Sequence, residues 1–290
     1  MLPLSKILSP VDFSERCLGA TRYAEALAAH FHSEITLLHV LEPMRYEFST
    51  LEFGATVMND LVSNRSLLAR KQLDAFLSEE LAGGPVKRVL LEGDPAQNIV
   101  QYAHTEQVNV ITMPTHGYGP FRRFILGSVT AKVLHDADCP VWTGVHMEQV
   151  PAVPSIAFRN IVCAVDLGPQ SRKALSWAAH MASEFNARLI LVHATPAIEV
   201  RPGEYFDQNL TAELSRAARE ELDKLGQGLS AEPEVFVEGG DPPKVVCRAA
   251  QRFQANLLVI GRGSAAGIFG RLRTNAYAII RESPCPVVSV

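Results

Sequence analysis

The sequence Ile-Leu-Ser-Pro-Val-Asp at residues 7–12 returns as Ile-Val-Cys-Ala-Val-Asp at residues 161–166, 154 positions later. Short apolar runs of this kind are typical of strands buried on both faces of a parallel sheet. Three further blocks return in the same order, at 37–40 and 191–194, at 92–95 and 239–242, and at 139–141 and 285–287. Convergence of two strands would explain one block but not four, so the sequence predicts a duplicated domain.

The length of 290 residues suits two domains of ordinary size. The repeat predicts domains at 1–146 and 158–290. The segment between them, Met147–Ala157, contains two prolines and no helical or strand period, and is interpreted as a linker.

Each copy alternates apolar runs with segments of helical period, which favours a parallel sheet with helices on both faces. A long helical region is expected after the second strand and is clearest from Ser66 to Leu81. Asp94 and Asp241 are expected as helix N-caps because proline follows each. The fold class is therefore α/β, two tandem doubly wound domains, each with a five-stranded parallel sheet. The expected strands are 7–11, 35–40, 86–91, 108–113 and 139–143, and 161–165, 189–194, 235–237, 256–260 and 285–290.

Composition excludes several classes of function. The formal net charge of −4 gives no support for nucleic-acid binding, and no apolar run reaches the length needed to span a membrane. The N-terminus lacks the layout of a secretory signal, and the five cysteines form no Cys-x-x-Cys pair. A reduced, cytoplasmic protein without a disulfide framework or a metal site is expected.

The segment Thr115–Val129 follows an expected strand and opens an expected helix. Gly117 lets ligand oxygens approach the backbone, and the helix start at Gly127 and Ser128 offers unpaired amides to an anion. Arg122 and Arg123 would add positive charge. The structural alternative is a plain connecting loop in which Ser128 is the N-cap.

This loop resembles the nucleotide loop of the universal stress protein family, written Gly, two residues, Gly, nine residues, then Gly-Ser or Gly-Thr. Gly117, nine residues and Gly127-Ser128 match its later part, but Pro114 stands at the first glycine and lacks an amide donor. The resemblance covers both halves of the chain. It implies strand order 3-2-1-4-5, intramolecular pairing of the two domains through their last strands, and a homodimer as a further option.

The resemblance also implies an adenine nucleotide as ligand, namely ATP, with Mg as an option. Asp12 would contact the ribose or a bound metal, and the backbone of Val40 would lie beside the adenine. The phosphates would be held by Gly117, Gly127, Ser128 and Val129. From the residues alone, Asp12 could equally be a turn residue or a helix cap.

The second copy keeps Asp166 but not the loop pattern. In one register Gly261 takes the place of the first glycine; in the other, Arg273-Thr274 replaces Gly127-Ser128. Neither register restores the full pattern, so nucleotide binding is expected mainly in the N-terminal copy. His39 and His193, which end the second strands, are interpreted as satisfied histidines and not as metal ligands.

The leading hypothesis is a stress-response protein that binds ATP or a related nucleotide as a sensor or regulator. No general base is evident beside the loop, so no catalytic residue is assigned, and at most slow ATP hydrolysis is expected. Two alternatives remain: an interaction scaffold with vestigial sites, and an ATP-consuming enzyme of related α/β fold.

Overall fold

The computed structural model describes residues 4–43, 55–116, 126–144, 156–168, 170–196, 208–229, 232–262 and 271–290. They form two compact units, one comprising Pro3–Val141 and the other Ala157–Val290, and Trp142–His146 is grouped with the second. The expected linker lies almost wholly outside the described residues.

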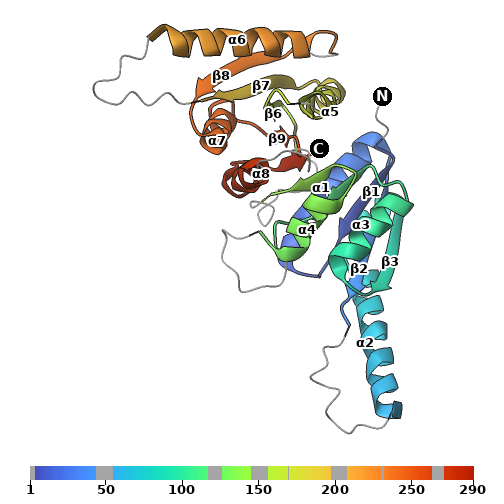
Figure 1. Ribbon diagram of the computed structural model, residues 1–290. Helices are drawn as coiled ribbons and strands as arrows, with labels where there is room; N and C mark the ends of the chain where they lie inside the picture. The colour runs from blue at the N-terminus through green and yellow to red at the C-terminus, as the bar shows by residue number, and fades with distance from the viewer. Residues whose placement is uncertain are drawn as a thin grey trace. The chain divides into compact units, whose positions relative to one another are not determined.

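The N-terminal copy alternates strands and helices along the chain (Figure 1). Its elements are β1 (Lys6–Pro10), α1 (Glu15–Phe31), β2 (Glu34–Leu41), α2 (Ala55–Ala75), the 3-10 helix η2 (Glu80–Gly83), β3 (Val86–Glu92), α3 (Pro95–Thr105), β4 (Val110–Thr112), α4 (Ser128–Asp136) and β5 (Val141–Thr143).

The C-terminal copy repeats this alternation. Its elements are β6 (Asn160–Ala164), α5 (Ser171–Glu184), β7 (Arg188–Thr195), α6 (Gln208–Gly226), β8 (Glu234–Gly239), α7 (Pro242–Arg252), β9 (Leu257–Ile260), α8 (Arg271–Glu282) and β10 (Val287–Ser289).

The sheet order within each copy confirms the predicted fold class. It is β3-β2-β1-β4-β5 in the first copy and β8-β7-β6-β9-β10 in the second. β1 pairs in parallel with β2 on one side and β4 on the other, and β6 does the same with β7 and β9. The connections therefore leave the first strand in opposite directions, which creates a topological switch point at its carboxyl end.

Helices cover both faces of the N-terminal sheet. Cys17 of α1 and Leu73 of α2 join Ile35 and Leu37 of β2 in one buried cluster, so these two helices share a face. Helices α3 and α4 contact each other, and α7 and α8 repeat that contact in the second copy. The residues of β4 and β9 are buried throughout, as expected for strands covered on both sides.

The long helical region predicted after the second strand, clearest at 66–81, begins and ends earlier in the structure than that clearest part. Helix α2 begins at Ala55 and ends at Ala75, and Leu77 then takes a left-handed conformation with φ of 49° before η2. The start was missed because the apolar residues of the first half, Leu61 and Val62, are exposed and form no stripe toward the core.

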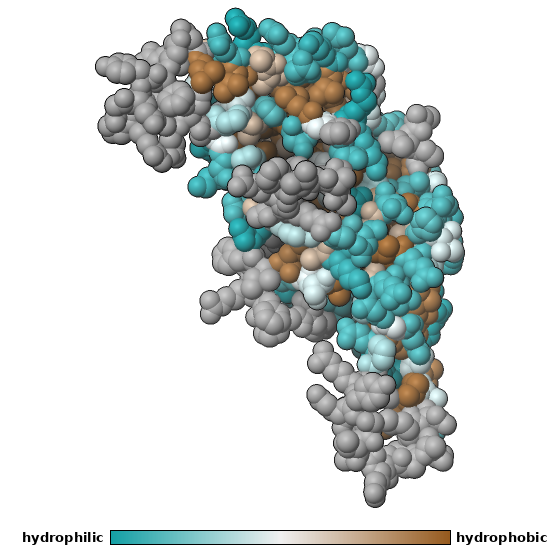
Figure 2. Space-filling model, viewed as in Figure 1, coloured by the Kyte–Doolittle hydropathy of each residue, from teal (hydrophilic) through white to brown (hydrophobic). Residues whose placement is uncertain are grey.

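Apolar side chains are concentrated in the interior. The face drawn in Figure 2 is mainly hydrophilic where it is coloured. Within the described ranges, none of the helices combines the length and the hydropathy needed to cross a bilayer.

The two expected aspartate caps differ, and this difference is testable. Asp94 accepts a hydrogen bond of 2.7 Å from the Gln97 amide, whereas Asp241 holds the N-cap position of α7 without any side-chain cap bond. We expect Asp94→Ala to reduce the stability of α3 by about 1 kcal/mol. The matched change Asp241→Ala should cost α7 clearly less, as measured by hydrogen exchange of each helix in urea.

The effect of Asp94 should also depend on pH. The Gln97 amide lowers the pKa of the Asp94 carboxyl, so the charged form is the one that the fold stabilises. The stabilisation is therefore present above the ordinary aspartate pKa of about 4 and is lost as pH falls through the lowered value. An equal loss for Asp94→Ala at neutral pH and at pH 2 would contradict this account.

Candidate functional site

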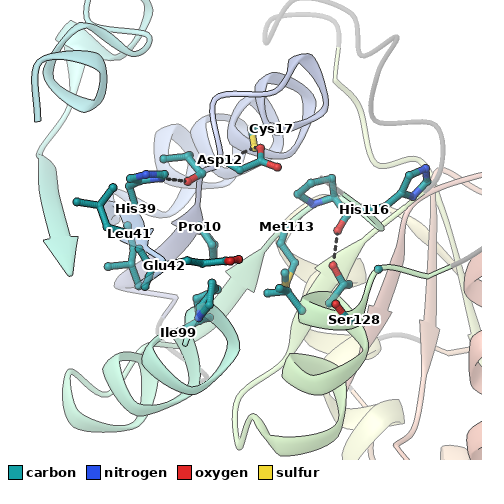
Figure 3. A pocket seen from close by; sticks show the side chains of 18 of the residues that line it. Pro10, Asp12, Cys17, His39, Leu41, Glu42, Ile99, Met113, His116 and Ser128 are labelled. Atoms are coloured by element: carbon teal, nitrogen blue, oxygen red, sulfur yellow. Dashed lines mark hydrogen bonds between the residues drawn. The ribbon is translucent and has the colours of Figure 1, made fainter. Parts of the chain in front are cut away.

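A cavity of about 940 Å³ lies in the N-terminal unit, at the switch point of its sheet. It is lined by residues from the carboxyl ends of β1, β2 and β4 and from the first turns of α3 and α4. Figure 3 shows Asp12, Cys17 and His39 on one side of this space, and Met113, His116 and Ser128 on the other.

The turn between β1 and α1 fixes the position of Asp12. Its Oδ1 atom accepts hydrogen bonds from the Ser14 amide at 3.1 Å, the Ser14 hydroxyl at 2.6 Å and the Cys17 thiol. Phe13 bridges the turn in a left-handed conformation with φ of 63°, which is uncommon for a residue other than glycine. Asp12 therefore is the turn residue that the alternative reading expected, and it also lines the cavity.

Cys17 holds its proton beneath this turn. Burial, together with the negative charge of Asp12, raises the pKa of the thiol to about 12. At neutral pH the thiol is a hydrogen-bond donor and a poor nucleophile. Its contribution to the site is to orient Asp12.

The end of β2 forms the next wall. His39 Nδ1 lies 2.7 Å from the Val11 carbonyl oxygen, which can only accept, so this nitrogen carries the proton. The Phe13 ring packs on the imidazole with centroids 4.4 Å apart. This confirms that His39 has a hydrogen-bond partner within the protein, near the carboxyl end of β2. Val40, paired in register with Leu91, is half-buried and lines the cavity.

The start of α4 forms the opposite wall. Gly127, and not Ser128, occupies the N-cap position, so the alternative in which Ser128 caps the helix is wrong. The Gly127 amide donates to the Thr115 carbonyl at 2.8 Å and is thereby used within the protein. The amides of Ser128 and Val129 have no hydrogen-bond partner among the described residues, and both residues line the cavity.

Proline at position 114 is accommodated without strain on the helix that follows. Its carbonyl accepts a 3.0 Å hydrogen bond from the Thr130 hydroxyl, which joins β4 to α4. The strand register makes Gly261 the counterpart of Pro114. A Cβ atom at Gly261 would lie 3.9 Å from Ala174 Cβ, an ordinary contact, so the fold accepts a side chain here. Compared with glycine, proline at position 114 therefore removes only the backbone amide donor.

Sequence reasoning missed two charged residues of the cavity. Arg65, from the middle of α2, is half-buried and lines it, and Glu42, just beyond β2, is exposed and extends its carboxylate toward the open space (Figure 3). Among the described lining residues, Arg65 is the one lysine or arginine. Glu42 could have been found from its place two residues after Val40, but nothing local indicates that α2 reaches the cavity. Gly117, Arg122 and Arg123 lie outside the described residues.

The C-terminal unit builds the same turn around a much smaller cavity. Asp166 Oδ1 accepts from the Gly168 amide at 2.9 Å and from the Ser171 hydroxyl at 2.8 Å. His193 Nδ1 donates to the Val165 carbonyl at 2.9 Å, and Leu167 is left-handed. The cavity beside this turn has a volume of about 200 Å³.

Two doubly wound α/β units define a tandem α/β protein, and each unit has a cavity at its switch point, the place where open α/β sheets generally bind ligands. The model of the universal stress protein family matches residues 3–143 and again residues 157–290. The chain therefore belongs to the universal stress protein family and carries its domain twice, which confirms the resemblance read from the loop.

One relative and one solved structure match nearly the whole chain, and a further structure matches about half of it. A universal stress protein of Mycobacterium tuberculosis is 27% identical over 289 residues, covering 94% of this chain and 90% of the relative. The crystal structure of a universal stress protein from Archaeoglobus fulgidus has a TM-score of 0.69 at 23% identity, and covers 100% of this chain and 97% of that chain. A second structure from that organism, in complex with dAMP, matches at 23% identity with a TM-score of 0.33, covering 46% of this chain and 97% of that chain.

The two glycines that flank these loops should respond differently to alanine. A Cβ atom at Gly127 would lie 3.3 Å from both the His116 Cα and the Thr115 carbonyl oxygen, which are backbone atoms that must shift to make room. We expect Gly127→Ala to destabilise α4 by about 1 kcal/mol, the lower end of overpacking costs. Gly261→Ala, with ordinary contacts, should be neutral or slightly stabilising. Hydrogen exchange of α4 and β9 measures the change in stability for each variant. Equal destabilisation by the two substitutions would contradict the prediction that the Gly127 position is crowded and the Gly261 position is not.

Proposed function

We propose that this chain binds ATP or a related adenine nucleotide in its N-terminal unit and acts as a nucleotide-dependent sensor or regulator in a stress response. The observation that carries the proposal is the cavity of about 940 Å³ at the switch point, with the Asp12 carboxylate on one wall and the start of α4 on the other. A volume of this size lies in the range of small-molecule sites.

The lining residues divide the cavity into regions of different chemistry. Val40 and its apolar neighbours Leu41 and Ile99 suit the planar adenine. Asp12 suits the ribose hydroxyls, since a carboxylate accepts hydrogen bonds. The amides of Ser128 and Val129, at the positive end of the α4 dipole, suit phosphate oxygens. In this proposal Gly127 allows close approach, and Gly117 completes the phosphate loop.

The charges of the cavity fit a nucleotide that carries a cation. Of the charged residues that the structure describes on the cavity wall, Asp12 and Glu42 would repel bare phosphates, and Arg65 offsets this only in part. Carboxylate oxygens are ligands that Mg²⁺ accepts alongside phosphates, so Glu42, or Asp12 in place of its contact with the ribose, would hold the ion with the nucleotide. Mg²⁺ would then supply charge neutralisation at the phosphates.

The cavity of the C-terminal unit is less suited to binding a nucleoside triphosphate. Its cavity, at about 200 Å³, is below the usual range for such ligands. In the register of α8, Arg273 and Thr274 stand where α4 has Gly127 and Ser128. We therefore assign nucleotide binding mainly to the N-terminal unit, with regulation by binding and slow hydrolysis at most.

The Ser128 amide can be removed without removing the helix. Ser128 is the first residue of α4, a position where proline is well tolerated, and Gly127 already has the extended backbone that precedes proline (φ −62°, ψ 147°). We expect Ser128→Pro to weaken ATP binding by about ten- to hundredfold, the value of one charge-assisted hydrogen bond. Isothermal titration calorimetry of the full chain measures this loss.

Two controls separate this effect from damage to the site. Ser128→Ala keeps the amide and should retain ATP affinity within about threefold. Adenosine, which has no phosphate, should bind Ser128→Pro as it binds the unchanged protein. If Ser128→Pro bound ATP with unchanged affinity while hydrogen exchange showed α4 intact, the phosphate assignment would be wrong.

A further inference from the structure

Helix α2 carries an apolar surface that faces solvent. Ala69 and Leu73 are buried and mark the side of the helix that packs on its own unit. Away from that side, Leu61, Leu67 and Leu68 are 47%, 53% and 61% exposed, and we call these three residues the leucine surface. The N-terminal part of α2 extends beyond the sheet of its unit (Figure 1). Large apolar side chains that gather on an exposed surface mark an interaction site.

The equivalent helix of the second copy lacks most of this surface. The fully buried residues Leu73 and Leu222 align α2 with α6 at an offset of 149 positions. At that offset the residues that match Leu61, Leu67 and Leu68 are Leu210, Arg216 and Ala217. The shared fold therefore does not require the leucine surface, which indicates a role that is particular to the first copy.

Two exposed charges of opposite sign flank the leucine surface. Asp60 precedes it and Lys71 follows it, eleven residues later. Eleven residues are about three turns, so both side chains lie on the same side of the helix. Neither forms an ion pair with another described residue, whereas Arg70 and Asp74 of the same helix pair with each other at 3.3 Å. Asp60 and Lys71 are therefore available to charges on another molecule.

This order of residues is complementary to itself when the helix is reversed. In an antiparallel pair of identical α2 helices, Asp60 of each copy faces Lys71 of the other, and Leu61 of each faces Leu68 of the other. The two-fold axis passes near Asn64, whose amide both donates and accepts and can pair with its own counterpart. A parallel pair would instead place each charge against its own kind. The charges therefore favour the antiparallel arrangement.

We propose that the leucine surface binds α2 of a second copy of this chain, in an antiparallel dimer with two-fold symmetry. Three leucines per copy form a smaller apolar core than that of a standard interface, which buries about 800 Å² on each partner. The dimer is therefore weak, with a dissociation constant in the micromolar range. It requires no nucleotide, so it is measured without one and stands or fails independently of the proposed function.

Analytical ultracentrifugation of the full chain over a range of concentrations tests the proposal. We expect a monomer–dimer equilibrium, and we expect Leu68→Glu to raise its dissociation constant about hundredfold, because the symmetry brings two carboxylates into an apolar contact. Leu210→Glu is the matched control, since Leu210 is 36% exposed on α6, and it should leave the equilibrium unchanged. A monomer at every concentration, or a dimer that Leu68→Glu leaves intact, would overturn the proposal.

Charge reversal tests the antiparallel arrangement. Asp60→Lys and Lys71→Asp should each weaken the dimer about tenfold, because each creates two contacts between like charges. The double variant should restore the dissociation constant to within about threefold of the original. Circular dichroism checks that the helix content is kept. Two single reversals without effect, or a double variant that is weaker than both, would reject the pairing of Asp60 with Lys71.

Two further measurements distinguish a second copy from a membrane as the partner. Hydrogen exchange should slow in α2, and not in α6, as the protein concentration rises through the dissociation constant. The chain should also stay in solution when it is sedimented with vesicles of phosphatidylglycerol and phosphatidylcholine. Binding of the monomer to these vesicles, lost in Leu68→Glu, would assign the leucine surface to lipid and overturn the dimer.

Discussion

The pairing of the first strand between the second and the fourth is the constraint on which this structure depends. Because β1 has parallel partners on both sides, the chain leaves it toward opposite edges of the sheet, and the loops part above its carboxyl end. The helices that follow these strands could cover this gap only if their side chains filled it. The same pairing of β6 with β7 and β9 opens the equivalent gap in the second copy.

The turn beside this gap has the same hydrogen-bonding arrangement in both copies, although the donor residues differ. An aspartate accepts hydrogen bonds from the residues that start the following helix: from Ser14 and Cys17 in the first copy, and from Gly168 and Ser171 in the second. A left-handed residue follows the aspartate, and a histidine of the neighbouring strand donates to the carbonyl before it. The turn is thus held by hydrogen bonds within the protein.

The sequence predicted features that depend on local pattern and repetition. The fold class, the strand order and the place of Asp12 and Val40 follow from short apolar runs and from a loop resembling that of a known family. Features that depend on tertiary packing were not predictable. Arg65 reaches the cavity from the part of α2 whose apolar residues, such as Leu61 and Val62, are exposed. Gly127 holds the cap where a Cβ atom would lie 3.3 Å from the Thr115 carbonyl oxygen, a crowding that the sequence alone does not reveal.

The two possible alignments of the second loop with the first are both present in the structure, one before the loop and the other after it. Before the loop, β4 and β9 place Pro114 opposite Gly261, an offset of 147. After it, the cavities place Val129 and Asn275 at equivalent positions, an offset of 146. The second copy has therefore lost one residue between conserved walls. A shorter loop, with the amide side chain of Asn275 in place of Val129, accompanies a smaller cavity with fewer charged lining residues on an unchanged sheet, so the duplication preserved the scaffold while its two cavities diverged.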